Sequence, residues 1–179
     1  MQSEQDLIRN FVDGDHEAFR TLVEKYQTPL LNYLYRFTGK YEVAEEIVQD
    51  TFLVVFQKIS TFKLQSSFRA WLYAIATNHA SNHLRKHSPI YNNEVLSTAS
   101  DIQLDPSEKI IEQERAVAVQ KALKTLPEKQ RAIFILRFYQ QFTYEEIAET
   151  LKCPIGTVKS RICYTLQKLK GVLSSHQEE

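Results

Sequence analysis

Apolar residues recur at helical spacing along nearly the whole chain, and residues that break helices are scarce. The 179 residues include only four glycines and five prolines. Phe19, Leu22, Val23 and Tyr26, for example, follow the 3.6-residue period that places side chains on one face of a helix. The glycines and prolines stand where helices are expected to start, bend or stop. We therefore expect an all-α fold.

Two helices are expected before residue 40. Ser3 and Asp6 can cap a short first helix, and Gly14 stands where that helix would stop. Asp15 opens a longer helix that Gly39 ends. The proline at position 29 is expected to kink or interrupt this second helix.

Two further helices complete a first domain, which we place at residues 1–88. The third helix is expected from about 41 to 59, with a buried stripe made of Val43, Ile47, Thr51, Val55 and Ile59. Residues 62–67 interrupt the pattern as a loop. A fourth helix then continues the helical period through Phe68, Leu72, Ile75, Ala76 and Leu84.

The stretch "SPIYNNEVLSTASDIQLDPS" has a different character from the segments around it. It holds no basic residue and few large apolar ones, which is typical of a flexible linker, and we place this linker at 89–105. Asp105, Pro106 and Glu108 then supply the signals of a new helix start. A second helical domain is therefore expected at 106–174.

The strongest local signal is "FTYEEIAETLKCPIGTVKSRICYTLQKLKG". Thr143 can cap a helix together with Glu146. After a tight turn around Lys152 and Cys153, a second helix begins near Pro154. This arrangement predicts a helix-turn-helix. Its second helix is expected to bury Val158, Ile162, Thr165 and Leu169, and to expose Lys159, Ser160, Arg161, Tyr164 and Lys168, the donors that a major-groove helix needs.

Charge is segregated along the chain although the formal net charge is zero. The charged side chains of residues 41–50 are all acidic, whereas those of residues 51–93 are all basic. A second acid-free stretch covers residues 150–177. We expect two basic surfaces of the kind that binds phosphates. One of them lies in "SFRAWLYAIATNHASNHLRKH", which contains both aromatic and basic residues and no acid.

No apolar run approaches the roughly 20 residues of a membrane span, and the N-terminus lacks the features of a signal peptide. The two cysteines fit a reducing compartment, so we expect a cytoplasmic protein.

His79, His83 and His87 could share one helix face as metal ligands do. That face is basic, however, and no carboxylate or cysteine is near it, so contact with phosphates is the plainer interpretation. We expect no metal, no cofactor and no enzymatic activity.

The chain resembles the extracytoplasmic-function sigma factors, which are small two-domain initiation subunits of bacterial RNA polymerase. In the first domain the resemblance rests on "AEEIVQDTFLVVFQKISTF" followed by "SFRAWLYAIATNHASNHLRK". In the second domain it rests on "LPEKQRAIFILRF", "TYEEIAETL" and "PIGTVKSR". The order and spacing of these pieces make the signal specific, and the match covers nearly the whole chain.

The resemblance implies that the first domain binds the polymerase clamp and opens the −10 region, while the second binds the −35 element. It also implies control by an anti-sigma factor and a part in a stress response. The polymerase surface would comprise Glu46, Gln49, Asp50, Phe52, Leu53 and Phe56. The −10 surface would comprise Phe62, Lys63, Ser66, Ser67, Arg69, Trp71, Asn78, Asn82, Arg85 and Lys86. The −35 surface would comprise Thr143, Pro154, Gly156, Thr157, Lys159, Ser160, Arg161 and Tyr164.

Three aromatic residues have an alternative interpretation. Phe52 and Phe56 could belong to the core, because most aromatic residues at helical spacing are core residues. Trp71, the only tryptophan, could also be buried.

The chain also departs from the family pattern at Asn82, where an aspartate is common, and at Tyr164 and Leu166, where arginines are frequent.

Two other classes of protein compete with this interpretation. A helix-turn-helix regulator that acts alone would explain the second domain, but it would leave the acid-rimmed patch around Gln49 and the aromatic and basic fourth helix without a purpose. A metal-dependent enzyme would need a convergent set of ligands, and the histidine row is the only candidate.

Overall fold

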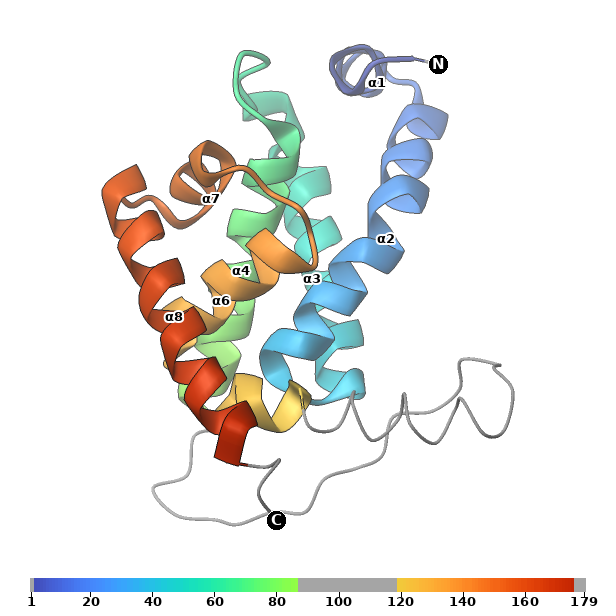
Figure 1. Cartoon of the computed structure of the whole chain (residues 1–179). Helices are drawn as coiled ribbons and strands as arrows, with labels where there is room; N and C mark the ends of the chain where they lie inside the picture. Colours follow the sequence, from blue (N-terminus) through green and yellow to red (C-terminus); the bar gives the residue numbers. More distant parts are fainter. Residues whose placement is uncertain (1, 87–118, 176–179) are drawn as a thin grey trace, which may run out of the picture.

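The computed structural model describes residues 2–86 and 119–175, and helices connected by short loops make up both of these ranges, with no strand in either. The N-terminal half, residues 2–86, contains α1 (Glu4–Val12), α2 (His16–Thr38), α3 (Tyr41–Lys58), the short 3-10 helix η1 (Ile59–Thr61) and α4 (Phe68–Lys86). The C-terminal half, residues 119–175, contains α6 (Glu128–Phe138), α7 (Tyr144–Leu151) and α8 (Ile155–Ser175), after a helical stretch at 119–124. Figure 1 shows the C-terminal half lying against α4 and α2.

The predicted helix ends of the N-terminal half are confirmed. The Ser3 side chain and Asp6 form a capping box at α1, and the Asp15 side chain caps α2. Gly39 ends α2 in the left-handed conformation, with φ of 79°. This left-handed backbone is the reason that glycine is needed at position 39, since the nearest atoms to a Cβ there are the ends of the flexible side chains of Lys124 and Gln120, which can move.

The expected interruption at Pro29 does not occur, because α2 continues through this residue as one helix. Its neighbours Leu30, Tyr33 and Leu34 are fully buried. Burial of this apolar face stabilises the helix against the loss of one backbone hydrogen bond at the proline.

The core of the N-terminal half forms where α2, α3 and α4 pack together. Of the stripe predicted for α3, Ile47, Thr51, Val55 and the following Ile59 are buried, while Val43 is half-buried. In α4, Phe68, Leu72 and Ala76 are buried as expected, and Ile75 and Leu84 are half-buried.

The predicted helix-turn-helix is present in the C-terminal half. Thr143 and Glu146 form the expected capping box at the start of α7. Lys152 closes α7 in the left-handed conformation, with φ of 49°, and α8 starts at Ile155. The four residues predicted to face inward, Val158, Ile162, Thr165 and Leu169, are all buried. The expectations for the linker at 89–105 and for a helix start at 105–108 lie outside the described residues.

The two halves contact each other directly, through α4 with α7 and through α2 with α6. The segment between α6 and α7 also takes part in this contact. Its Phe142 is fully buried and Gln140 is 9% exposed. Nothing in the sequence patterns predicted this contact between the halves.

Candidate functional surfaces

The α3 surface predicted to bind a protein partner is exposed except at one residue. Glu46, Gln49, Asp50, Leu53 and Phe56 are exposed, with Leu53 61% and Phe56 47% exposed. The expectation that Phe52 is part of this surface is wrong, because its side chain is only 9% exposed and packs in the core. At helical spacing Phe52 follows Val48, which is also buried, so the buried face of α3 is wider than the predicted stripe.

The apolar part of this surface extends beyond α3. The ring of Phe56 lies 5.2 Å from that of Phe11 in α1 and 5.3 Å from that of Phe19 in α2. Val12, next to Phe11, is 51% exposed. Sequence reasoning missed the contributions of α1 and α2 because helical spacing on α3 alone does not show which helix lies beside it. The result is an exposed aromatic patch with acidic side chains of α3 at its edge, suited to a protein partner.

The loop before α4 forms an aromatic cluster with the first turn of that helix. The ring of Phe62 lies 5.1 Å from that of Trp71 and 5.8 Å from that of Phe68. Phe68 is buried, whereas Phe62 and Trp71 are half-buried. Trp71 therefore satisfies both earlier interpretations in part, because it packs against the core and also shows one side at the surface.

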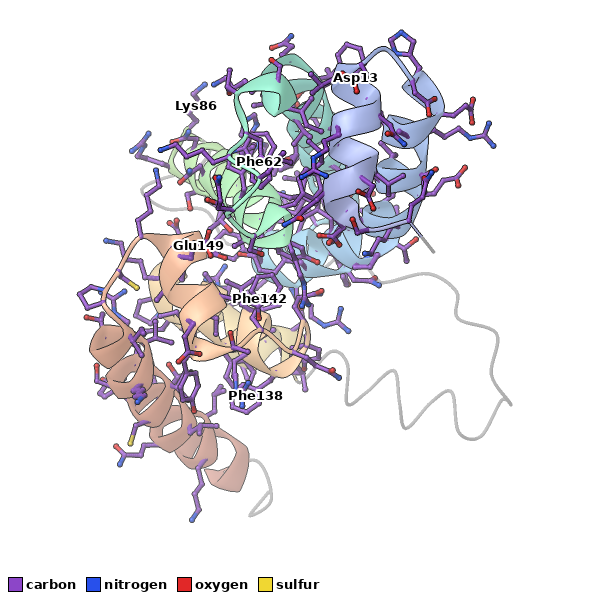
Figure 2. The ribbon with its side chains drawn as sticks, turned by 90° about the horizontal axis from the view of Figure 1, so that it is seen from above. Asp13, Phe62, Lys86, Phe138, Phe142 and Glu149 are labelled. Carbon is purple, nitrogen blue, oxygen red and sulfur yellow. The ribbon has the colours of Figure 1, made fainter. Side chains whose placement is uncertain are left out.

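This cluster borders a cavity of about 250 Å³. The loop and α4 contribute Thr61, Phe62, Lys63, Ser66, Ala70, Trp71 and Ala74 to its lining. The rest of the lining comes from the C-terminal half, through Glu149 of α7 and Lys152 of the turn. Figure 2 labels Phe62 in the N-terminal half and Glu149 in the C-terminal half, and both residues line this cavity.

The C-terminal part of α4 carries exposed polar and basic side chains, as predicted. Asn78, Asn82, Arg85 and Lys86 are exposed, and Arg85 Nη2 donates to Asn82 Oδ1 at 2.7 Å. Lys63 and Ser66 of the loop are also exposed, and Ser67 is half-buried, where its hydroxyl accepts from the backbone N–H of Ala70. These residues leave one edge of α4 open to a phosphate backbone.

Arg69 differs from the other predicted residues of α4 because it faces the C-terminal half. Its guanidinium donates to the backbone carbonyl of Gln140 and lies 4.0 Å from the centre of the Phe142 ring. Its Nη1 also lies 3.9 Å from a carboxylate oxygen of Glu146. The guanidinium that was expected to lie along DNA is therefore engaged in contacts within the protein.

Two of the three residues of the histidine row lie within the described part of the chain. His79 and His83 are half-buried on α4, and His87 lies outside the described residues. Within 2–86 and 119–175, no group of three or more His, Cys, Asp or Glu side chains could hold a metal ion.

The recognition helix α8 presents most of its predicted residues to solvent. Pro154, Gly156, Lys159, Ser160 and Tyr164 are exposed, as is Thr143 at the start of α7. Thr157 and Arg161 are half-buried. The expectation for Lys168 needs correction, because it is half-buried and its Nζ donates to the backbone carbonyl of Thr125 at 2.9 Å. The donors available to a ligand therefore concentrate in the first two turns of α8.

Two sequence families match the chain. Residues 22–90 match Sigma-70 region 2, and residues 116–169 match Sigma-70, region 4. The RNA polymerase sigma-H factor of Pseudomonas aeruginosa is 34% identical over 171 residues, which cover 90% of this chain and 89% of that protein. The ECF RNA polymerase sigma factor SigW of Bacillus subtilis is 32% identical, over 87% of this chain and 88% of that protein.

Two solved structures share the fold. CnrH, in complex with the cytosolic domain of CnrY, matches with a TM-score of 0.77 and 22% identity, over 97% of this chain and 99% of that one. The sigma factor RpoE from Bartonella quintana, in complex with the anti-sigma factor NepR, matches with a TM-score of 0.68 and 26% identity, over 87% of this chain and 96% of that one. Among the described residues, no helix is both long enough and apolar enough to cross a membrane.

Proposed function

The chain belongs to the extracytoplasmic-function sigma factors of RNA polymerase, and we propose that it directs initiation at promoters whose −35 and −10 elements it recognises and whose −10 region it helps to open. The single observation that carries this proposal is that one chain combines three surfaces of different chemistry: an exposed aromatic patch on α3, an aromatic and basic loop beside α4, and an exposed helix-turn-helix. The domains that perform these roles are proposed at 1–88 and 106–174, with the linker at 89–105.

The α3 patch would bind the polymerase clamp. Leu53 and Phe56 provide apolar contact area, and Gln49 and Asp50 provide polar contacts at its edge. An apolar centre with a polar rim is the usual composition of a protein interface. Four acidic residues lie on α3, so this surface would repel DNA. Polymerase and DNA would therefore bind at different surfaces of the protein.

The loop and the start of α4 would capture unpaired bases of the −10 element. Opening a duplex without ATP requires compensating binding energy, and stacking of a base on an aromatic side chain supplies about 1–3 kcal/mol. Phe62 and Trp71 are half-buried and border a cavity, so each has a face against which a base can stack. Lys63, Arg85 and Lys86 would contact the phosphates of the same strand.

The helix-turn-helix would read the −35 element in the major groove. Lys159 and Ser160 lie in the first two turns of α8, where a recognition helix contacts base edges. Thr143, Pro154, Gly156 and Thr157 surround the N-termini of α7 and α8, whose backbone N–H groups can bind phosphates. Few cations are present on α8, so a modest salt dependence is expected.

An anti-sigma factor is the proposed regulator. The support for this partner is that RpoE, which shares 26% identity and the fold over 87% of this chain, was solved with the anti-sigma factor NepR. The exposed aromatic patch on α3 would be available to such a partner as well as to polymerase. The relatives are sigma factors, and we propose no catalytic activity of the chain itself.

Transcription in vitro tests the proposal directly. Core polymerase is supplied with a library of genomic fragments, with and without the protein, and transcript start sites are sequenced. The proposal expects a set of start sites that depend on the protein and share two upstream elements. Binding to DNA without any protein-dependent start site would favour a helix-turn-helix regulator that acts alone.

A further inference from the structure

The first helix, α1, contributes Phe11 to the aromatic patch, while its first turn lies away from that patch. The helix ends at Val12, before residue 22, where the match to Sigma-70 region 2 begins. Its residues Leu7 and Ile8 are buried, and α1 packs against α2. Figure 1 shows α1 at the same end of the N-terminal half as the loop before α4. A role for this helix therefore depends on what its two ends contact.

The first turn of α1 is tied to the loop before α4, which spans residues 62–67. Gln5 Nε2 donates to the backbone carbonyl of Leu64 at 3.0 Å. Leu64 lies inside a turn, in which the backbone N–H of Ser66 donates to the carbonyl of Lys63 at 2.9 Å. Among the described residues, the Gln5 amide makes the only hydrogen bond between residues 63–66 and another part of the chain. This bond therefore holds the turn in place against α1.

The first turn of α1 is itself anchored to α2. The Glu4 carboxylate accepts from Lys25 Nζ and from the Tyr26 hydroxyl. Burial raises the pKa of Tyr26 above its ordinary range, so this hydroxyl stays protonated and can donate. The centre of the Tyr26 ring also lies 5.6 Å from that of Phe68, which packs against Phe62. The start of α1 is thus fixed beside the aromatic cluster.

The other end of α1 lies in the aromatic patch on α3. The Phe11 ring packs against the rings of Phe19 and Phe56, with centroids 5.0 Å and 5.2 Å away. Phe11 follows Gln5 by six positions, which is about 9 Å along a helix. One short helix therefore connects the patch proposed to bind polymerase with the loop proposed to capture bases.

We propose that Gln5 is a positioning residue for base capture, and that α1 holds the loop in a fixed place relative to the patch. This inference rests on the proposed function. Lys63 and Ser66 flank Leu64 in the turn, so restraint of the Leu64 carbonyl also restrains the side chains proposed to meet the −10 strand. A loop that is already ordered loses less conformational entropy when a strand binds, so it binds that strand more tightly.

Gln5→Glu and Gln5→Ala remove the bond in two different ways. The carboxylate of Gln5→Glu has the length of the amide, but it cannot donate to the Leu64 carbonyl. An acid in the first turn suits the positive end of α1, so the helix itself should not be weakened. Gln5→Ala loses the bond without adding a charge. Gln27→Ala, at an exposed glutamine of α2, is the matched control.

The loop is first measured in the full chain without DNA or polymerase. Trp71 is the only tryptophan, and its ring lies 5.1 Å from that of Phe62 in the loop. Quenching of its fluorescence by acrylamide therefore reports how tightly the loop covers it. We expect a higher quenching constant for both Gln5 variants and no change for Gln27→Ala, with the helix content by circular dichroism unaltered in all three.

The same variants are then assayed with core polymerase on a promoter identified by transcription in vitro, with a fluorescent base analogue in its −10 region. Both Gln5 variants should lower the equilibrium constant for promoter opening about fivefold, the factor that loss of one net hydrogen bond gives. Affinity for core polymerase, measured by titration of labelled enzyme, should equal that of Gln27→Ala. A merely structural role for Gln5 would instead lower opening and polymerase affinity together.

Unchanged quenching or unchanged opening in the Gln5 variants would each refute the inference. A defect in Gln5→Glu alone would indicate charge repulsion and would also refute it, as would an equal loss in Gln27→Ala. A loss of polymerase affinity as large as the loss of opening would place Gln5 outside a positioning role. If the unchanged protein directs no start site, the proposed function fails, whereas intact transcription with normal opening by both Gln5 variants refutes the role of Gln5 alone.

Discussion

The two basic regions of this protein, on α8 and at the start of α4, differ in how far other parts of the protein cover them. On α8, Lys159, Ser160 and Tyr164 face solvent. At the start of α4, Arg69 is held by the C-terminal half, and the cavity beside Phe62 has Glu149 on its far wall. One region is thus exposed, whereas the other is partly covered by the C-terminal half. Under the proposed function, recognition of the upstream element and capture of the downstream strand would be separable steps.

The difference follows from where each region lies in the fold. The exposed face of α8 points away from the helices that bury its opposite face, so its predicted side chains remain accessible. The start of α4 lies where the two halves meet, because α7 packs against α4. Variants in the two regions should therefore have different consequences for free protein and for its complex with polymerase.

The largest effect is expected from Lys159→Ala combined with Arg161→Ala on α8. Base and phosphate contacts of this kind contribute about 1–3 kcal/mol each, so transcription from dependent promoters should fall by about 30-fold or more. Polymerase binding should be unchanged. The control is Lys129→Ala, which removes an exposed cation from α6 of the same half. Transcription from the same promoters at undiminished strength would show that α8 does not read the −35 element.

A smaller effect is expected from Phe62→Ala in the loop before α4. Loss of one stacking surface should reduce promoter opening about tenfold, since stacking is worth about 1–3 kcal/mol per base. A fluorescent base analogue in the −10 region reports the opening. On a promoter with a pre-opened −10 region the defect should largely disappear, because the cost of separating the strands is removed. An equal defect on both templates would instead indicate damage to the packing of Phe62 against Phe68 and Trp71.

Loss of polymerase affinity by about fivefold, or about 1 kcal/mol in total, is expected from Gln49→Ala combined with Asp50→Ala, because most interface residues cost less than about 1 kcal/mol each when truncated. Both side chains are exposed, so the fold should be unaffected. Affinity is measured by titration of labelled core enzyme. Glu24→Ala, at an exposed acid of α2, serves as a control for the change in charge. Equal affinities for all three proteins would remove α3 from the polymerase interface.

The smallest effect is expected on stability, from Thr143→Ala at the capping box of α7. The Thr143 hydroxyl accepts from the backbone N–H of Glu146 at 3.1 Å, and loss of such a cap costs about 1 kcal/mol. Chemical denaturation followed by circular dichroism measures this change. Thr143→Ser keeps the acceptor and should restore most of the stability. If serine and alanine destabilise equally, the hydroxyl does not act as a cap.

Much of the fold could be predicted because its signals are local. The capping boxes at Ser3 and Thr143, the glycine at 39 and the inward residues of α8 each depend on neighbours within one or two helical turns. Helical spacing did not predict the burial of Phe52, because the width of the buried face of a helix depends on the helices that surround it. It failed in the same way for Phe11 and Phe19, which reach the α3 patch from other helices.

The contact between the halves could not be predicted for a different reason. Gln140 meets Pro29 and Tyr73 across more than 60 residues of sequence, and a glutamine in a loop carries no pattern that points to such partners. Arg69 was recognised as a functional cation, yet its partners Gln140, Phe142 and Glu146 depend on how the halves dock. Local periodicity therefore predicted most of the residues that are exposed within each half, and only the three-dimensional arrangement showed which of them the other half covers.

The central claim is that the protein opens promoters only together with polymerase, and one titration tests it most directly. A promoter duplex identified by transcription, labelled for binding and carrying a fluorescent base in its −10 region, is titrated at about physiological salt with the protein alone and with its complex with core enzyme. We predict weak binding without base unpairing for the protein alone, and tight binding with unpairing for the complex. Tight, sequence-specific binding by the free protein, with no further change on addition of core enzyme, would contradict the account and identify a regulator that acts alone.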